Sequence, residues 1–241
     1  MWLSLIPNDA QRVSLVDRQS IWPAPDGTDA EMIITLKAEL LQTVLLATPR
    51  VCRIHYRIDS VDAAMHMDNR PTVPWPQAAA LKDHSFELML TEKGAMIVPT
   101  VEGKIPARLR SWLNLISEDM RSCWAVPPDA VTEGQTWRLL PAVPGGLPPG
   151  TSAARVEIDY QLDRLRDNNA DVGVDFAVTV TIEADGVEKQ GEGSGHADIA
   201  LHREIGLRQG ERRGRMEISD GRTRNQVIRS SMQVVCRAGD P

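Results

Sequence analysis

The sequence VGVDFAVTVTI, residues 172–182, decides the fold class of this 241-residue chain. Its apolar residues alternate with small or polar ones, and the same alternation occurs in residues 156–162. A period of two residues is typical of a strand with one buried and one solvated face, and such strands form antiparallel sheets. Because turn residues separate several segments of this kind, we expect a C-terminal β-meander over residues 151–237.

The N-terminal strand half, residues 1–104, shows the same pattern less regularly. Residues 51–61 alternate clearly, and a hairpin is expected within residues 85–101. Residues 32–41 also alternate, although their Leu and Ala content permits a helix as well as a strand. A proline-rich excursion over residues 68–80 separates these elements.

One segment, residues 105–124, has helical periodicity instead. Apolar residues recur at spacings of three and four from Leu109 to Cys123, and Pro106 suits a first helical turn. We therefore expect one amphipathic helix over residues 106–123. Its apolar stripe needs a cover, and the concave face of a curved sheet would provide it. The opposite, solvated face is expected to carry Arg110, Asn114, Ser117, Glu118 and Arg121.

Together these patterns predict a β-dominated α+β protein. A long, curved antiparallel sheet of about ten strands, resembling a half-barrel, would wrap around the single helix. The chain is expected to form one domain, 1–241, in which the Pro/Gly-rich residues 141–150 connect the helix region to the meander. Three glycines with the parity of the inward face, Gly191, Gly193 and Gly195, are expected where the sheet coils around the helix.

Composition limits the class of protein. The net charge of −6 is modest, and no stretch approaches the roughly eighteen apolar residues of a membrane-spanning helix. Three cysteines without a C-x-x-C pair exclude a zinc ribbon and favour three reduced thiols over one disulfide with one free thiol. The apolar start, Met1 to Ile6, is too short for a signal peptide. The expected location is therefore periplasmic or envelope-associated if a leader was removed, and cytoplasmic otherwise.

No residue set indicates catalysis, a cofactor or a metal. The glycine-rich residues 191–195 precede no helix and lack the lysine of a phosphate-binding loop. His196 and His202 share a strand face with Asp198, but the two histidines are six residues apart, about 20 Å along a strand. A solvated outer face is therefore favoured over a metal site. An enzyme would need scattered residues, such as His55, His84 and Glu87, to converge without any pattern that predicts it.

Tryptophan is unusually frequent, with six residues against two phenylalanines and two tyrosines. Most lie near loops or element ends, where they either line the mouth of an apolar pocket or plug the ends of a core. The candidate ligand-binding residues are Leu109, Trp112 and Ile116 on the helix, together with Trp75, Trp124 and Trp137.

Basic residues cluster on the last two hairpins. They either dock an anionic headgroup, a polyanion or an acidic partner, or keep an exposed sheet edge from pairing with a neighbour. Aromatic residues are absent nearby, which argues against single-strand nucleic-acid binding because bases need stacking platforms. The candidate residues of this anionic-partner face are Arg208, Arg212, Arg213, Arg215, Arg222 and Arg224.

Residues 127–137, PPDAVTEGQTW, resemble a turn-into-strand phrase of uncharacterised β-rich bacterial envelope proteins and lipoproteins. There, too, it follows a helix and precedes a meander with a glycine-alternating strand. The order of elements is more distantly similar to that of lipoprotein-carrier half-barrels, which are open antiparallel sheets with helices over the mouth. The resemblance implies an envelope protein, and no functional residue is carried over from either family.

The leading hypothesis is a non-enzymatic envelope or periplasmic binding protein. It would hold an apolar small molecule, an acyl chain or a partner's apolar segment in the concavity between sheet and helix. The alternative is a structural or protein-interaction subunit of a larger assembly. No cofactor and no nucleic-acid partner are expected. An open apolar cavity favours the first hypothesis, and a completely filled core favours the second.

Overall fold

The computed structural model describes residues 5–238 except 9, 25–28, 49, 69, 92–93, 99–104, 106, 126, 128–130, 140–150, 185–186 and 220–224. The expected connector, residues 141–150, and the expected first helical residue, Pro106, lie outside the described residues.

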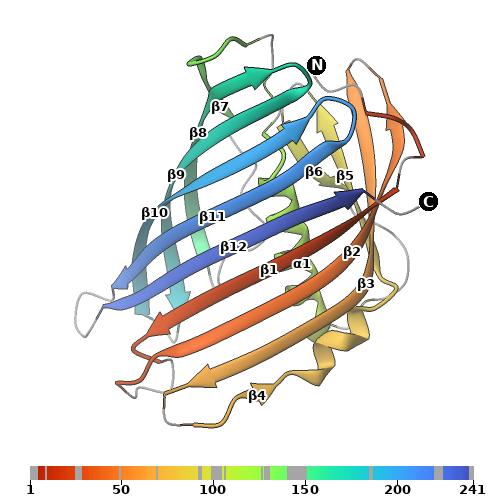
Figure 1. Cartoon of the computed structure of the whole chain (residues 1–241). Helices are drawn as coiled ribbons and strands as arrows, with labels where there is room; N and C mark the ends of the chain where they lie inside the picture. The colour runs from red at the N-terminus through yellow and green to blue at the C-terminus, as the bar shows by residue number, and fades with distance from the viewer. Residues whose placement is uncertain are drawn as a thin grey trace.

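Twelve strands of the described chain form a single antiparallel sheet that does not close into a barrel (Figure 1). The N-terminal strands are β1 (Ala10–Trp22), β2 (Met32–Ala47), β3 (Val51–Met67), β4 (Val73–Pro74), β5 (Ser85–Thr91) and β6 (Gly94–Val98). The C-terminal strands are β7 (Thr136–Leu139), β8 (Thr151–Arg166), β9 (Asn169–Ala184), β10 (Val187–His202), β11 (Gly206–Ser219) and β12 (Gln226–Ala238). The predicted β-dominated α+β fold is confirmed, with more strands than expected.

The two ends of the chain meet in the middle of the sheet. The strand order is β6-β5-β3-β2-β1-β12-β11-β10-β9-β8-β7, with β4 beside β3. Strands β1 and β12 pair antiparallel from Gln11 opposite Ala238 to Trp22 opposite Val227. Strands β11 and β12 are therefore interior strands. The interpretation that their arginines guard an exposed sheet edge is wrong, because each of these strands has a neighbour on both sides.

The helix α1 (Ala107–Ser122) lies across the concave side of the sheet, and a short 3-10 helix, η1 (Pro76–Leu81), packs near it (Figure 1). The predicted apolar stripe is confirmed, since Ile116 and Met120 are fully buried. Ser117, which we expected on the solvated face, is only 3% exposed. Its hydroxyl donates to the Asn114 carbonyl oxygen at 3.0 Å, so burial leaves no unpaired donor there.

The helix does not pack against the inward glycines of β10. A Cβ atom added at Gly195 would lie 2.2 Å from Cζ of Phe176, and one added at Gly191 would lie 2.8 Å from a methyl carbon of Val180. These glycines face inward as predicted. Gly191 and Gly195 make room for side chains of the neighbouring strand β9, and Gly193 lies against Met216 of β11, so the bulky groups next to these glycines come from the sheet and not from the helix.

Two glycines of β11 lie against the chain at the C-terminal end of the helix. A Cβ atom at Gly206 would lie 2.6 Å from Cη2 of Trp124, and one at Gly210 would lie 3.1 Å from Sγ of Cys123. Gly206 also has a positive φ of 89°, which favours glycine. The chain just beyond α1 therefore packs directly onto the backbone of β11, and this contact positions the helix over the C-terminal strands.

Candidate functional site

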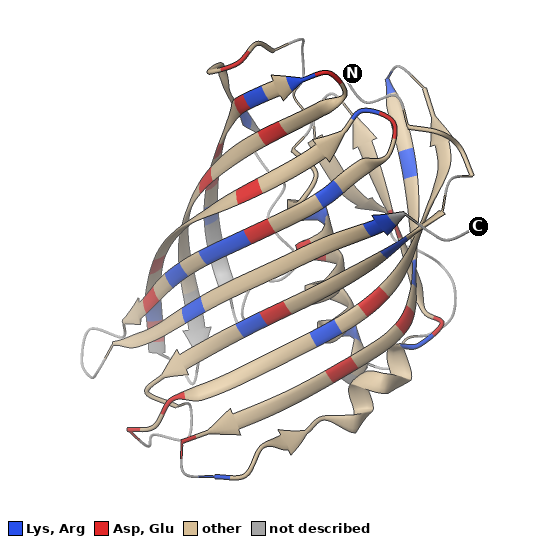
Figure 2. Cartoon of the chain, in the orientation of Figure 1, with Lys and Arg blue, Asp and Glu red and all other residues tan. Residues whose placement is uncertain are grey.

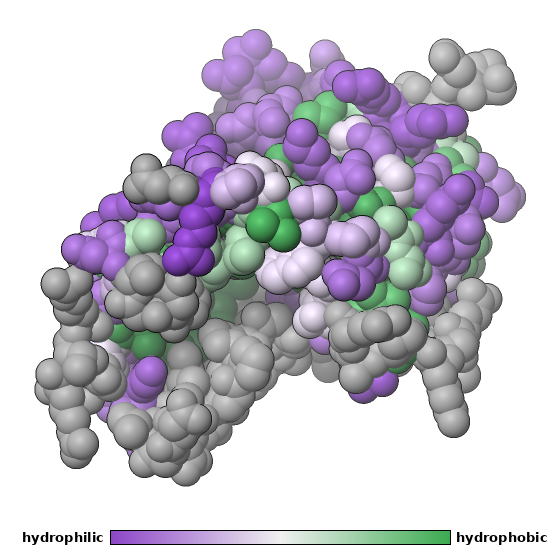
Figure 3. All heavy atoms as spheres, turned by 90° about the horizontal axis from the view of Figure 1, so that it is seen from below, coloured by the Kyte–Doolittle hydropathy of each residue, from purple (hydrophilic) through white to green (hydrophobic). Residues whose placement is uncertain are grey.

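A cavity of about 330 Å³ lies between the C-terminal half of α1 and the concave face of the C-terminal strands. Figure 3, seen from below, shows the molecule hollowed on this side, with hydrophobic residues inside the hollow. Ligand pockets begin at about 300 Å³.

The wall of the cavity is mainly apolar and remains partly exposed to solvent. Along β9, Phe176 and Val178 face inward and are only half-buried, whereas Asp175 and Thr179 face outward. Half-buried apolar residues from α1, β8, β9, β11 and β12 share this wall, namely Leu115, Val156, Ile158, Phe176, Val178, Met216 and Ile228. Apolar surface left uncovered in a concavity favours an apolar occupant, since burying it releases water.

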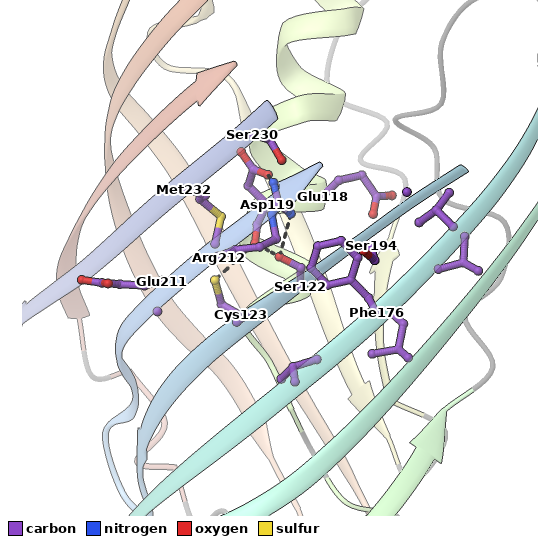
Figure 4. A pocket seen from close by; sticks show the side chains of 18 of the residues that line it. Glu118, Asp119, Ser122, Cys123, Phe176, Ser194, Glu211, Arg212, Ser230 and Met232 are labelled. Carbon is purple, nitrogen blue, oxygen red and sulfur yellow. Dashed lines mark hydrogen bonds and ion pairs between the residues drawn. The ribbon is translucent and has the colours of Figure 1, made fainter. Parts of the chain in front are cut away.

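Arg212 brings a charge into this apolar wall from β11 (Figure 4). Its Nη2 lies 2.6 Å from Oδ1 of Asp119 on α1, and its Nη1 donates to Oγ of Ser122 at 3.3 Å. The sequence placed Arg212 on an outer face that would meet an anionic partner. That placement is wrong, because Arg212 has the same strand parity as the inward residues Gly210 and Gly214.

A second buried carboxylate, Asp17, approaches the same guanidinium. Asp17 on β1 is opposite Met232 on β12, and Met232 is opposite Arg212 on β11, so the three residues form one row across the sheet. Asp17 is 2% exposed, and Nε2 of Gln19 donates to its Oδ2 at 3.1 Å. Asp119 therefore forms an ion pair with Arg212 at the wall of the cavity, and Asp17 acts on the same guanidinium through its charge.

Burial dominates the protonation of both carboxylates. Loss of hydration raises the pKa of Asp119 to about 7, although the nearby Arg212 opposes that rise. Burial also raises the pKa of Asp17, again against the lowering effect of Arg212. At neutral pH the cluster of Asp17, Asp119 and Arg212 therefore holds a proton on Asp119 for part of the time.

The six candidate ligand-binding residues lie elsewhere. Trp124 is fully buried, and its Nε1 donates to Oη of Tyr56 at 3.0 Å, which in turn donates to Oε1 of Gln42 at 2.7 Å. Leu109 and Ile116 are buried in the same core.

The remaining tryptophans pack in pairs. Trp75 and Trp112 meet edge to face at a centroid distance of 5.1 Å, and Trp137 stacks on Tyr160 at 5.4 Å. All six candidates thus belong to the main core or pack against it, and none of them lines the cavity described above.

The other arginines of the proposed anionic-partner face lie on the outer surface or beyond the described residues. Arg208 donates to Asn169 Oδ1 at 3.2 Å, Arg213 is exposed, and Arg215 pairs with Glu217. Acidic and basic residues are mixed along the strands of the sheet (Figure 2). Arg222 and Arg224 lie outside the described residues.

The histidines of β10 belong to the same outer surface. His196 Nδ1 lies 2.8 Å from Asp175 Oδ1 and its Nε2 lies 3.3 Å from Asp198 Oδ1, while His202 Nδ1 accepts from the backbone N–H of Glu204. The side chains of His196 and its partners are all more than half exposed, as a solvated face predicts. In the part of the chain that the structure describes, no group of three or more His, Cys, Asp or Glu residues could hold a metal ion.

Sequence reasoning missed Asp17 and Asp119, although both carried a signal. Asp17 has the parity of Val13 and Leu15, which are buried on the inward face of β1. Asp119 follows Ile116 by three positions and precedes Cys123 by four, which places it on the buried side of the helix. A charged residue at an inward position of a patterned segment needs a partner, and the inward arginine of β11 supplies it.

Comparison with known proteins shows a fold likeness without a family. No family model and no curated protein matches the chain. A structure described under "lipid–protein interactions in lipovitellin" aligns with a TM-score of 0.56 and 12% identity, over 99% of this chain and 26% of that chain. The chain thus spans about a quarter of that lipovitellin chain and shares its fold there.

An outer membrane channel from Pseudomonas putida F1 also aligns, over 98% of each chain with 9% identity, but its TM-score of 0.28 is too low to support an argument. Among the described residues, no helix is both long and apolar enough to cross a membrane. The chain is a β-rich protein of unclear family, and its resemblance to envelope lipoproteins and carriers stays a prediction.

Proposed function

We propose that this chain is a non-enzymatic binding protein that holds an apolar ligand, such as an acyl chain, in the cavity between α1 and strands β8–β12. The observation that carries the proposal is the open, mostly apolar space of about 330 Å³, whose wall residues are only half-buried. A completely filled core would have favoured a purely structural role. The fold likeness to lipovitellin, a protein described for its lipid interactions, supports the same reading.

The size of the cavity limits the ligand. At about 330 Å³ it lies near the lower end of the range of ligand pockets, about 300–1,000 Å³. A single chain fits this range better than a lipid with two chains. Each methylene group that leaves water contributes about 0.8 kcal/mol, so one medium-length chain can overcome the entropy lost on binding.

A structural or protein-interaction role remains the second candidate. The edge strands β6 and β7 each have one side without a partner strand among the described residues. Such an edge can pair with a strand of another chain. An envelope location would suit both candidates and remains part of the proposal.

Dye displacement tests the proposed function. None of the tryptophans described above lines the cavity, so intrinsic fluorescence is a poor reporter, and an environment-sensitive apolar dye displaced by 1-dodecanol serves better. The variant Val178→Trp fills the cavity from β9. Its matched control, Thr179→Trp, places the same side chain on the exposed face of the same strand.

We expect one dye site per chain, at least about tenfold weaker 1-dodecanol binding in Val178→Trp, and unchanged binding in Thr179→Trp. Absence of displacement, or equal binding by the two variants, would overturn the proposal. If the dye does not bind and a protein partner is recovered in stoichiometric amount, the second candidate is favoured.

A further inference from the structure

Two oxygen atoms of the cluster formed by Asp17, Asp119 and Arg212 are left without a hydrogen bond. Oδ2 of Asp119 and Oδ1 of Asp17 are buried, and neither has a hydrogen-bond partner in the described part of the chain. A buried acceptor without a donor destabilises the folded state. Asp119 is 1% exposed and is one of the residues that line the cavity, so its unpaired oxygen lies next to the space that a ligand would occupy.

We propose that the natural ligand of the cavity is an acyl or alkyl chain whose polar end is a hydrogen-bond donor, a hydroxyl or a protonated amine, received by Asp119. A free fatty-acid carboxylate is disfavoured. This inference rests on the proposed function, because it names the chemical class of the ligand for the same cavity.

The charges of the wall favour a donor over an anion. Glu118 and Arg121 on α1 pair with each other at 2.6 Å and cancel. Arg212 is already paired with Asp119 and also interacts with the charge of the buried Asp17, so it has no free charge to offer an anionic ligand. A ligand carboxylate would add a further negative charge in a poorly hydrated site, where like charges repel strongly.

The guanidinium is already engaged. Nη2 of Arg212 donates to Asp119 and Nη1 donates to Ser122, so an anionic ligand would have to compete with both. A donor such as a hydroxyl would instead satisfy Oδ2 of Asp119 without disturbing either bond. Hydrogen bonds to an ionised acceptor are among the stronger ones in proteins.

Polar residues of β1 and β12 lie beside the cluster of Asp17, Asp119 and Arg212. Gln19 of β1 and Ser230 of β12 line the cavity next to the cluster. Ser230 Oγ lies 3.2 Å from the position of a Cβ atom at Gly214, on the inward face of β11. The opposite side consists of the apolar residues of β8 and β9, including Val156 and Phe176. This division orients an amphiphile with its polar end toward α1 and its chain along β8 and β9.

A head-group series on the full chain tests the inference. The probes are 1-dodecanol, dodecylamine, 1-methoxydodecane and dodecanoate, each measured by dye displacement at pH 8, where the amine is protonated and the acid is ionised. We expect the alcohol or the amine to bind about tenfold more tightly than both the methyl ether and the carboxylate. The tighter of the two donors identifies the head group as hydroxyl or ammonium.

The variant Asp119→Asn provides a second test of the inference. It can place an amide N–H where Oδ2 accepts, so the preference for the alcohol over the methyl ether should fall to about onefold. Asp171→Asn, on the exposed face of β9, should leave that preference unchanged. If Asp119→Asn does not fold, the ratio of the affinities of the unmodified protein for the alcohol and for the methyl ether decides whether a donor head group is preferred.

The outcomes separate the two proposals. If no probe binds, the proposed function fails. If all four bind equally and Val178→Trp weakens all four, the proposed function stands and the donor head group is refuted. Tighter binding of dodecanoate than of 1-dodecanol would refute the donor head group as well.

Discussion

Arg212 of β11 and Asp119 of α1 form an ion pair, 2.6 Å from Nη2 to Oδ1, that joins the C-terminal end of the helix to the inward face of the sheet. The side chain of Asp119 is 2% exposed and that of Arg212 is 20% exposed. Removing one partner of a buried pair leaves the other charge without compensation, and this costs more than the pair itself contributes.

We therefore predict a large loss of stability for Arg212→Met. The free energy of unfolding should fall by about 3–5 kcal/mol, because Asp119 would stay buried without its ion-pair partner and Asp17 would lose the nearby positive charge. Arg213→Met on the exposed face of the same strand is the matched control, and it should change stability by less than about 0.5 kcal/mol. Urea denaturation followed by circular dichroism gives both values. Equal losses would contradict the assignment of Arg212 to the interior.

The same cluster makes stability depend on pH. Burial raises the pKa of Asp119 to about 7 in the folded protein, whereas in the unfolded chain this carboxyl titrates near its ordinary pKa of 3.8. Between these values the folded state binds more protons than the unfolded state, so stability falls as pH rises from about 4 to about 7. Asp17 acts in the same direction, since its pKa is also raised.

The groups facing Asp119 are Arg212 from β11, Asp17 from β1 and Glu118 from its own helix. Asp119→Asn should flatten the decline between pH 4 and 7, and Asp171→Asn should leave it in place. Chemical denaturation at a series of pH values measures the slope. If the free energy of unfolding rises between pH 4 and pH 7 in the unmodified protein and in the control Asp171→Asn, the account is contradicted.

Tyr56 links two buried polar groups, since it accepts from Trp124 Nε1 at 3.0 Å and donates to Gln42 Oε1 at 2.7 Å. Tyr56→Phe should destabilise the protein by about 1–3 kcal/mol, because both partners lose their bond inside the core. Tyr160→Phe is a matched control, since Tyr160 is also buried and its ring stacks on Trp137. We expect a smaller change there. A Tyr160 effect equal to or larger than the Tyr56 effect would show that the hydroxyl network is unimportant.

The thiols should react slowly in the native protein. Cys52, Cys123 and Cys236 are all free, as the sequence favoured, although Cys236 is only half-buried. Burial raises the pKa of Cys52 to about 11 and that of Cys123 to about 12, and it raises the pKa of Cys236 as well. Because the thiolate is the reactive form, a disulfide reagent at pH 8 should label these thiols only when the protein unfolds. Rapid stoichiometric labelling of Cys123 without unfolding would contradict the packing of the helix end.

Local alternation was enough to predict most strands. Residues 172–182 form part of β9 because their parity leaves one apolar face, and the helix stripe from Leu109 to Cys123 is likewise a local pattern. The pairing of β1 with β12 could not be predicted. It joins segments more than two hundred residues apart, and nothing in the sequence of either strand identifies the other as its neighbour. We misplaced Arg212 because we grouped it with the other arginines of the last two hairpins by composition. The alternation of the strand places Arg212 on the inward face and Arg213 on the outward face.

The cavity itself could not be predicted for a related reason. Whether apolar residues such as Phe176 and Val178 meet a helix or face an open space depends on where α1 lies on the sheet. That position is set by Trp124 and Cys123 packing on Gly206 and Gly210. These are contacts between distant segments, and no periodicity in either segment specifies them.

Intermolecular NOEs test the central claim most directly. With methyl-labelled Ile, Leu, Val and Met residues and bound 1-dodecanol, we predict NOEs from the alkyl chain to Val178 and Met216, which line the cavity. None is expected to Val13 or Val234, which are buried in the core. NOEs confined to the exposed residues Leu45 and Leu46, or no NOEs at a ligand concentration that saturates the protein, would contradict a ligand-holding cavity.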